Sequence, residues 1–198
     1  MTLQIHVEGS GDDIVLLHGW GMNATVWRAL GAAMAADYRV HAVEMPGYGV
    51  AEAALSAESL DEVIDALAAA LPARVRVCGW SLGGQVAMAW ARRHPAQVSH
   101  LVLLGSTPRF VSNGEWGHGM AQDEFDGFVA DVENSLPRAR LRFLTLQANG
   151  DVAARGVLRM LRESIDEGGA PADNAPAFGL ALLRDIDLRA DLPQIYQP

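Results

Sequence analysis

A serine flanked by glycines lies between an apolar strand-like run and an amphipathic helix-like run. The segment Gly79-Trp80-Ser81-Leu82-Gly83-Gly84 follows a β-branched run at 75–78 and leads into helical spacing from Leu82. In this context Gly-x-Ser-x-Gly predicts a nucleophile elbow, because the glycines allow a sharp turn that holds the serine strained above a sheet. The helix start beneath it favours developing negative charge. Ser81 is therefore the predicted catalytic nucleophile.

A second loop with glycines follows the strand predicted at 14–17. It reads His18-Gly19-Trp20-Gly21-Met22-Asn23. In sites built on such an elbow, one oxyanion donor is the backbone N–H of the residue after the nucleophile, here Leu82. The other comes from an upstream strand-end loop, here Trp20. Alone, the glycines would equally indicate a tight turn, but together with the elbow they favour an oxyanion hole.

The elements that must position these residues alternate along the first hundred residues. Short β-branched runs alternate with longer stretches of helical apolar spacing, which indicates βα units on a mostly parallel sheet. The predicted strands are 4–7, 14–17, 39–43, 75–78 and 98–104, and the predicted helices are 27–35, 60–71 and 82–93. Residues 1–106 are therefore predicted to form a doubly wound α/β core.

The character of the sequence changes after Gly105. Segments of helical periodicity, without a further convincing strand, occupy the chain to Asp187. They predict a helical cap inserted over residues 107–187, with helices at 122–135, 138–147, 152–167 and 176–184. Residues 188–198 are predicted to return towards the core.

Composition narrows the classes of function. The 198 residues are 50% hydrophobic and carry a formal net charge of −9, which argues against a nucleic-acid or anionic-membrane binder. No signal-peptide pattern and no apolar run of membrane-spanning length appears, so a cytoplasmic protein is expected. The single cysteine, Cys78, lies in an apolar strand, and no histidine spacing suggests a metal site. Neither a metal nor a cofactor is expected.

Several motifs together resemble one family of esterases. They are the loop at 18–23, Met45-Pro46-Gly47-Tyr48-Gly49, the elbow at 79–84, His94-Pro95 and Phe143-Leu144-Thr145-Leu146-Gln147. Over essentially its whole length, the sequence is similar to the pimeloyl-acyl carrier protein methyl ester esterases of biotin synthesis, which have the α/β-hydrolase fold. The resemblance implies a carboxylesterase that acts on a dicarboxylic acyl chain held by phosphopantetheine on an acyl carrier protein.

The resemblance also implies roles for individual residues. The acyl substrate would be contacted by Trp20, Ser81, Leu82, Phe143, Leu144, Thr145, Leu146 and Gln147. The acidic carrier protein would dock on Arg138, Arg142, Arg155 and Arg159. The sequence agrees with docking, because the arginines of each pair are four residues apart and share one helix face. The alternative is an ordinary solvated helix face, but in a chain this acidic docking is favoured.

The sequence departs from the family's pattern in one respect, the acid and the histidine of the catalytic triad. In this fold the triad order along the chain is Ser, then Asp or Glu, then His, on loops after later strands. Pro198 falls where the next core strand is expected, so the last core strands and both other triad members are expected to be missing. Of the histidines after Ser81, His94 and His100 are expected to lie far away, and only His118 is placed where it could approach.

Three hypotheses of function stay open. The first is the pimeloyl ester hydrolase, expected to be a monomer when complete. The second is a related esterase or lipase acting on small free esters. The third is a non-catalytic binding protein that keeps the fold and has lost the triad.

Overall fold

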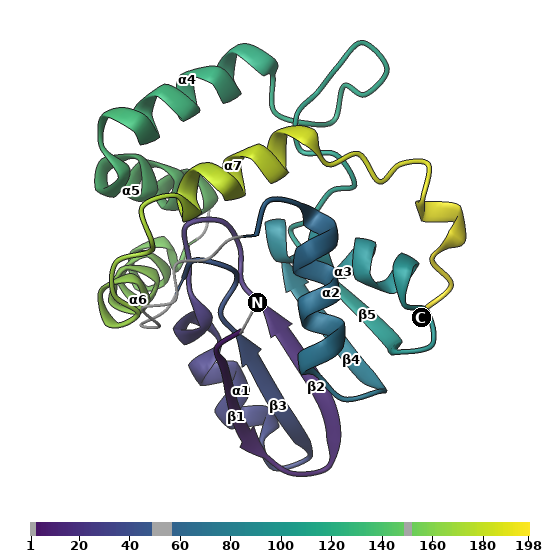
Figure 1. Ribbon diagram of the computed structural model, residues 1–198. Coiled ribbons are helices and arrows are strands. Elements are labelled where there is room, and N and C mark those ends of the chain that lie inside the picture. The colour runs from purple at the N-terminus through teal and green to yellow at the C-terminus, as the bar shows by residue number, and fades with distance from the viewer. Residues whose placement is uncertain (1–2, 49–56, 149–151) are drawn as a thin grey trace.

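The computed structural model describes residues 3–48, 57–148 and 152–198 of the protein (Figure 1). Five strands form one sheet in the order β1-β3-β2-β4-β5. Their bounds are Ile5–Gly9 (β1), Asp12–Leu17 (β2), Tyr38–Val43 (β3), Val75–Trp80 (β4) and Val98–Leu104 (β5). β1 pairs with β3 antiparallel, and every other neighbouring pair is parallel. The predicted mostly parallel sheet is confirmed.

Helices cover both faces of this sheet and one of its ends. They are η1 (Ala24–Trp27), α1 (Arg28–Met34), α2 (Leu60–Ala70), α3 (Leu82–Arg93), α4 (Gln122–Asn134), α5 (Leu136–Gln147), α6 (Ala154–Glu167), α7 (Ala175–Asp185) and η2 (Leu192–Gln194). None of the helices in the described ranges is long and apolar enough to cross a membrane. α3 has the predicted bounds. The predicted helix at 27–35 agrees with α1 to one residue at each end. A 3-10 turn precedes it, and the Asn23 side chain starts this turn by accepting the N–H of Thr25 at 3.0 Å.

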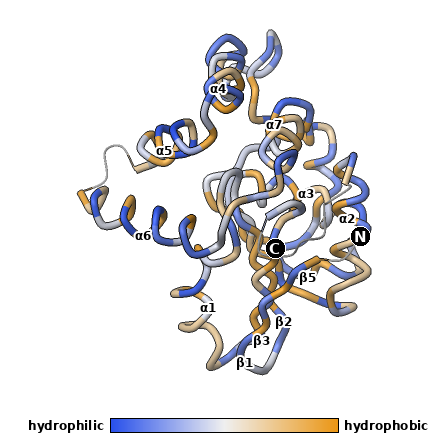
Figure 2. Tube along the Cα trace, turned by 60° about the vertical axis from the view of Figure 1, so that its left-hand side comes forward, coloured by the Kyte–Doolittle hydropathy of each residue, from blue (hydrophilic) through white to orange (hydrophobic). Residues whose placement is uncertain are grey.

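Alternation along the strands produces two apolar layers. On one face, Ile14, Leu16 and Cys78 pack with Trp27 from the η1 turn. On the other face, Val15 of β2 and the residues Val75 and Val77 of β4 pack with α2 and α3. In Figure 2 the hydrophobic colour follows the strands, whereas α4 to α6 alternate between hydrophilic and hydrophobic residues. Burial raises the pKa of the Cys78 thiol, which fits a packing role.

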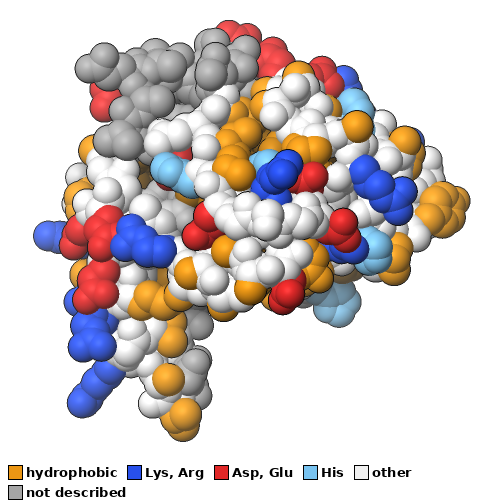
Figure 3. All heavy atoms as spheres, turned by 90° about the horizontal axis from the view of Figure 1, so that it is seen from below, with side chains coloured by type: hydrophobic (Ala, Val, Ile, Leu, Met, Phe, Trp, Pro, Cys, Tyr) orange, Lys and Arg blue, Asp and Glu red, His pale blue; other side chains and the backbone are white. Residues whose placement is uncertain are grey.

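Charged side chains at the surface are paired locally. Arg76 lies 2.9 Å from Asp12, and Arg93 lies 2.9 Å from Asp61. On the face seen in Figure 3, basic and acidic side chains lie next to one another. Exposed pairs of this kind contribute little to stability. That face therefore presents mixed charge rather than a basic surface.

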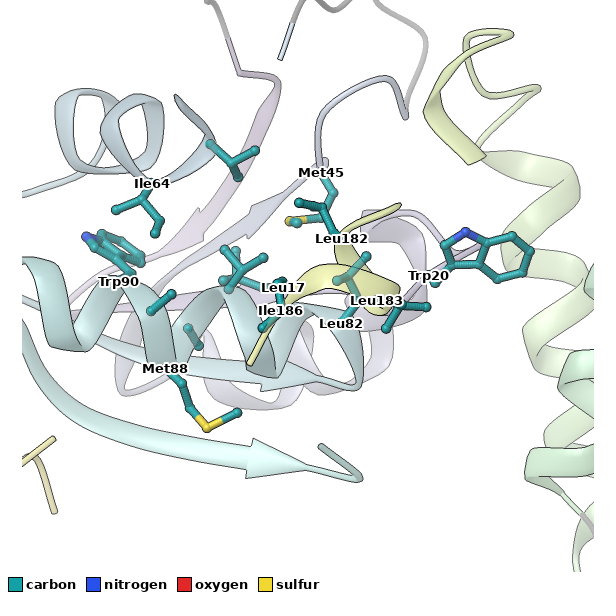
Figure 4. Close-up of a cluster of buried hydrophobic side chains, with 14 of the residues drawn as sticks. Leu17, Trp20, Met45, Ile64, Leu82, Met88, Trp90, Leu182, Leu183 and Ile186 are labelled. Carbon is teal, nitrogen blue, oxygen red and sulfur yellow. The ribbon is translucent and has the colours of Figure 1, made fainter. Parts of the chain in front are cut away.

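Helices α4 to α7 lie over the end of the sheet toward which the parallel strands point (Figure 1). Figure 4 shows Leu182 and Leu183 of α7 beside Leu17 and Leu82 of the core. The segments that lead into and out of these helices are tied together as well, because Arg109 lies 2.9 Å from the carboxylate of Asp187.

Asp187 also accepts hydrogen bonds from the guanidinium of Arg189, the nearer at 2.7 Å. The bonds from Arg189, with help from Arg109, hold the pKa of the Asp187 carboxyl well below its usual range. The carboxylate thus stays ionised between two arginines at the base of the cap, which α4 to α7 form.

His18 joins the carboxyl ends of β2 and β3. Its ring is fully buried, Nε2 accepts the N–H of Met45 at 2.9 Å, and Nδ1 lies 2.9 Å from the carbonyl oxygen of Gly19. Because Nε2 accepts, the proton sits on Nδ1, which donates to that carbonyl. Burial lowers the pKa of His18 to about 4. The ring is therefore neutral at neutral pH, as its structural role requires.

We expect His18 to make the free energy of unfolding fall as the pH drops from 6.5 to about 4. Between these pH values the His18 ring is protonated in the unfolded chain and neutral in the folded protein, so lowering the pH favours unfolding. A shift of this size corresponds to about 3 kcal/mol. Urea unfolding across the window should show a shallower pH slope for His18→Asn. The exposed His100 provides the control, and His100→Asn should keep the native slope. An unchanged slope in His18→Asn would contradict the assignment.

β5 forms an edge of the described sheet with apolar side chains in solvent. Val102, Leu103 and Leu104 are 49%, 40% and 41% exposed. The backbone N–H of Leu101 donates to the carbonyl oxygen of Pro198 at 2.9 Å, so the end of the chain lies beside this strand. An apolar edge strand favours pairing with another chain.

We expect Val102→Lys to reduce concentration-dependent self-association, because a charge on an edge strand opposes pairing. Val7 on β1, at the other edge of the sheet, is 56% exposed and gives the matched control Val7→Lys. Sedimentation of a dilution series should give a lower weight-average mass for Val102→Lys alone. Equal masses for the two variants would show that β5 is not the contact.

Candidate active site

Ser81 occupies the turn between β4 and α3 in a strained conformation. Its φ is 54° and its ψ is −117°, and it is the only non-glycine with positive φ among the described residues. Its N–H donates to the carbonyl of Leu104 at 2.9 Å, and its carbonyl accepts from Oγ of Ser106 at 2.8 Å. Such a conformation costs on the order of 1–3 kcal/mol and persists only where the surroundings fix it. Here the end of β5 and the segment after it do so.

Two glycines make this turn sterically possible. A Cβ at Gly79 would lie 2.4 Å from the carbonyl oxygen of Gly83. A Cβ at Gly83 would lie 2.4 Å from the carbonyl oxygen of Leu17. Both clashes are with backbone, which cannot move aside as a flexible side chain can. The first turn of α3 is thus pressed against the end of β2, with its N-terminus at Ser81.

The loop after β2 lies directly against Ser81. A Cβ at Gly19 would be 3.2 Å from the Cβ of Ser81. The N–H of Met22 donates to the carbonyl of Gly19 at 3.2 Å, and Gly21 has a φ of 73°, so residues 19–22 form a β-turn with glycine at its third position. Within the described ranges, the N–H groups of Trp20 and Leu82 have no hydrogen-bond acceptor. Both predicted donors are available for a ligand oxygen.

Buried polar side chains hold this turn from behind. Arg140 of α5 donates through Nε to the carbonyl of Gly21 at 2.8 Å, and Nη2 donates to the same oxygen. The hydroxyl of Tyr48 accepts the N–H of Gly21 at 3.3 Å. The carboxylate of Glu44 accepts the N–H of Ala24 at 3.0 Å. Burial raises the pKa of Tyr48 to about 12 and also raises that of Glu44. These tethers were not predicted from the sequence.

The Trp20 side chain connects the turn to the cap. It is 2% exposed, and its Nε1 donates to the carbonyl of Pro176 at 3.0 Å. Its ring meets Phe128 and Phe143 edge-on, at centroid distances of 4.9 and 5.5 Å, while those two phenylalanines stack at 5.2 Å. Figure 4 shows Trp20 directed away from the sheet, toward the cap helices. An aromatic wall therefore stands next to the candidate oxyanion turn.

The structure separates the five residues of the predicted substrate segment. Phe143 and Leu144 are buried in the cap interior. Thr145 is exposed and bonds a carbonyl of its own helix at 2.8 Å, and Leu146 is 59% exposed. Gln147 ends α5, and its side chain lies outside the described part of the chain. Of the five, only Phe143 is seen in contact with Trp20.

Four predicted docking arginines lie exposed on α5 and α6. They are Arg138, Arg142, Arg155 and Arg159. Arg142 forms an ion pair with Asp131 of α4, and Nε of Arg159 lies 3.9 Å from Glu163. Arg138 and Arg142 border a hollow of about 470 Å³ between α4 and α5. The four charges are thus accessible from solvent, two on each of two neighbouring helices.

The described residues provide no base for Ser81. The ring of His18 is occupied by backbone groups, and His94 directly follows α3, roughly 20 Å of helix from the serine. His118 packs against Trp116 with a centroid distance of 4.9 Å. No group of three His, Cys, Asp or Glu in these parts of the chain could hold a metal ion. The site therefore combines a candidate nucleophile with two free donors.

Known proteins are similar to this chain in sequence and in fold. The family model described as the alpha/beta hydrolase fold matches residues 13–151. The pimeloyl-[acyl-carrier protein] methyl ester esterase of Nitrosomonas europaea is 41% identical over 196 residues, which cover 98% of this chain and 77% of the relative. The protein of the same name from Vibrio cholerae is 37% identical over 198 residues, covering 100% of this chain and 77% of the relative. A solved esterase from Exiguobacterium antarcticum has a TM-score of 0.84 at 24% identity, covering 98% of this chain and 74% of that chain.

The likeness to the solved structure concerns the fold, and it confirms the predicted α/β-hydrolase architecture. The identity to the curated relatives goes further, because it extends along almost the whole of this chain and about three quarters of theirs. The chain belongs to the pimeloyl-[acyl-carrier protein] methyl ester esterase family of α/β hydrolases.

Proposed function

We propose that the protein is a carboxylesterase that hydrolyses the methyl ester of a pimeloyl chain held on an acyl carrier protein, with Ser81 as nucleophile. The observation that carries the chemistry is the positive φ of Ser81 beside two N–H groups without acceptors. A protein that only bound a ligand would gain nothing from a serine held in so costly a conformation. The names of the relatives support the choice of substrate.

In the proposed reaction, Oγ of Ser81 attacks the carbonyl carbon of the methyl ester while a base removes the hydroxyl proton. The carbonyl oxygen becomes negative and accepts hydrogen bonds from the N–H groups of Trp20 and Leu82. The C–O bond to the methyl group's oxygen then breaks, and methanol leaves with the proton from the base. Water attacks the acyl-serine in the same way and releases the carboxylic acid. The N-terminus of α3 favours the negative charge at both stages.

The base in this proposal is a histidine that is not among the six of this sequence, since none of the six contacts Ser81. In this fold a histidine oriented by a carboxylate takes the serine proton. Without such a pair, the hydroxyl stays protonated and attack is slow.

In this proposal the cap contacts the acyl chain and the carrier protein. Trp20 and Phe143 are buried against one another, so in this proposal their rings stand behind the apolar surface on which the methylene chain packs. The four exposed arginines on α5 and α6 would receive the acidic carrier. Asp131 already pairs with Arg142, so it would compete with the carrier for that guanidinium. The proposal places the reaction in the cytoplasm and takes the complete protein as a monomer.

Ser81 should be the residue that a fluorophosphonate modifies. The experiment supplies the triad by co-expressing the C-terminal segment of the Nitrosomonas europaea relative, then maps the label by mass spectrometry. Loss of the nucleophile from a serine triad lowers kcat by about a million-fold, so Ser81→Ala should abolish turnover. The control is Ser99→Ala, because the Ser99 hydroxyl bonds the carbonyl of Val75 and lies 3.2 Å from Nδ1 of His100, at the far end of β5 from the elbow. Label at another residue, or turnover in Ser81→Ala, would refute the assignment.

The same preparation separates the candidate substrates. Turnover of pimeloyl methyl ester on its carrier should exceed turnover of a short p-nitrophenyl ester in kcat/KM. A preference for the small ester would instead favour the general esterase. Absence of turnover on both, with intact folding, would favour the binding protein.

The docking arginines should affect only the carrier-bound substrate. We expect replacement of Arg138, Arg142, Arg155 and Arg159 by Glu to raise KM for that substrate and to leave small-ester kinetics unchanged. Added salt should weaken the native interaction, because exposed charges are screened over about 10 Å at 0.1 M. Arg39, exposed on β3, gives the control Arg39→Glu. Equal losses on both substrates would mean that these arginines only support the cap.

A further inference from the structure

Arg140 differs from the arginines around it. Arg138 and Arg142 are exposed, whereas Arg140 is 8% exposed on the inner side of the same helix. Burial lowers the pKa of its guanidinium. A buried cation is costly unless its donors are satisfied. Those donors reach a backbone carbonyl in the core rather than a carboxylate.

That carbonyl belongs to the turn next to Ser81. Gly21 has positive φ, its carbonyl accepts two donors of Arg140, and its N–H is held by Tyr48. The peptide units on both sides of Gly21 are therefore fixed by side chains. The Arg140 side chain also packs over the glycine, since a Cβ there would lie 3.5 Å from Cγ and 3.7 Å from Nε of Arg140. Only an arginine offers two donors in a rigid plane to one oxygen at this distance.

The orientation of Trp20 follows from this turn. Trp20 is its second residue and Gly21 its third, and the turn is closed by the bond from Met22 to Gly19. Rotation of the peptide after Gly21 would change the backbone angles of the turn and so redirect the N–H of Trp20. Because Gly19 lies against Ser81, even a small change in this turn would alter the distance and angle between the Trp20 N–H and the reacting oxygen.

We propose that Arg140 is a positioning residue for the oxyanion site, which holds the 19–22 turn through Gly21 and so aims the N–H of Trp20. The proposal rests on the proposed function for its catalytic consequence. The contact itself is independent of that function. Arg140 thus acts on the rate from the cap, without touching the substrate.

Two substitutions and one control test this. In the preparation that carries the triad, Arg140→Met should lower kcat for a short p-nitrophenyl ester and leave KM within about twofold. Removing an oxyanion donor outright costs about 10²- to 10³-fold, so displacing one should cost roughly ten- to a hundredfold. Arg140→Lys should recover part of this loss, because one ammonium donor can still reach the carbonyl. Arg162→Met is the matched control, since Arg162 is exposed on α6 and borders the same cavity between α5 and α6 as Arg140.

A second measurement needs no turnover. Amide hydrogen exchange of residues 18–24 in the chain alone should be faster in Arg140→Met, because the Met22 N–H loses protection when the turn loosens. Arg162→Met should exchange like the native chain. Should Ser81→Ala remain active, the proposed function would fail, yet exchange would still decide whether Arg140 holds the turn.

Native exchange and native kcat in Arg140→Met would overturn the proposal. So would a similar loss of kcat in Arg162→Met, because it would show a general effect of the cap. Circular dichroism and thermal unfolding show whether each variant is folded. If Arg140→Met is unfolded, the kcat and the exchange of Arg140→Lys decide. Full recovery of exchange protection with no recovery of kcat would also contradict the proposed link.

Discussion

The first turn of α3 and the carboxyl end of β2 touch backbone to backbone, and this contact sets the spacing of the whole site. A Cβ at Gly83 would lie 2.4 Å from the carbonyl oxygen of Leu17 and 2.6 Å from that of His18, so only glycine allows the approach. With the helix this close, the chain can pass from β4 into α3 only through the positive φ of Ser81. The same closeness brings Leu82 beside the turn after β2.

Much of this geometry is encoded locally and could be predicted. β-branched runs and helical spacing gave α3 its observed bounds, and Gly-x-Ser-x-Gly between a strand and a helix indicated the positive φ turn. α1 was predicted to within one residue at each end, but the 3-10 turn before it was not predicted. Asn23 accepts the N–H of Thr25, and that bond starts the turn.

The tethers behind the site could not be predicted in the same way, because their partners are distant in sequence. Arg140 and Gly21 are 119 residues apart, and Trp20 and Pro176 are 156 apart. No role was predicted for Arg140. The helical period offered a signal, since residues two positions apart point about 200° apart and Arg138 and Arg142 share the outer face. Nothing in the sequence indicated that Arg140 would donate to the carbonyl of Gly21.

Three cap helices each donate to, or accept from, the short segment that follows β2. Arg140 of α5 binds Gly21, the carbonyl of Ser164 in α6 accepts from Asn23 at 2.9 Å, and Pro176 of α7 accepts from Trp20. The cap is therefore not a module that can be exchanged by recombination. A cap transplanted from a relative to change substrate choice would arrive without its matching core contacts. Evolution or engineering of selectivity in this scaffold must alter the core turn together with the cap.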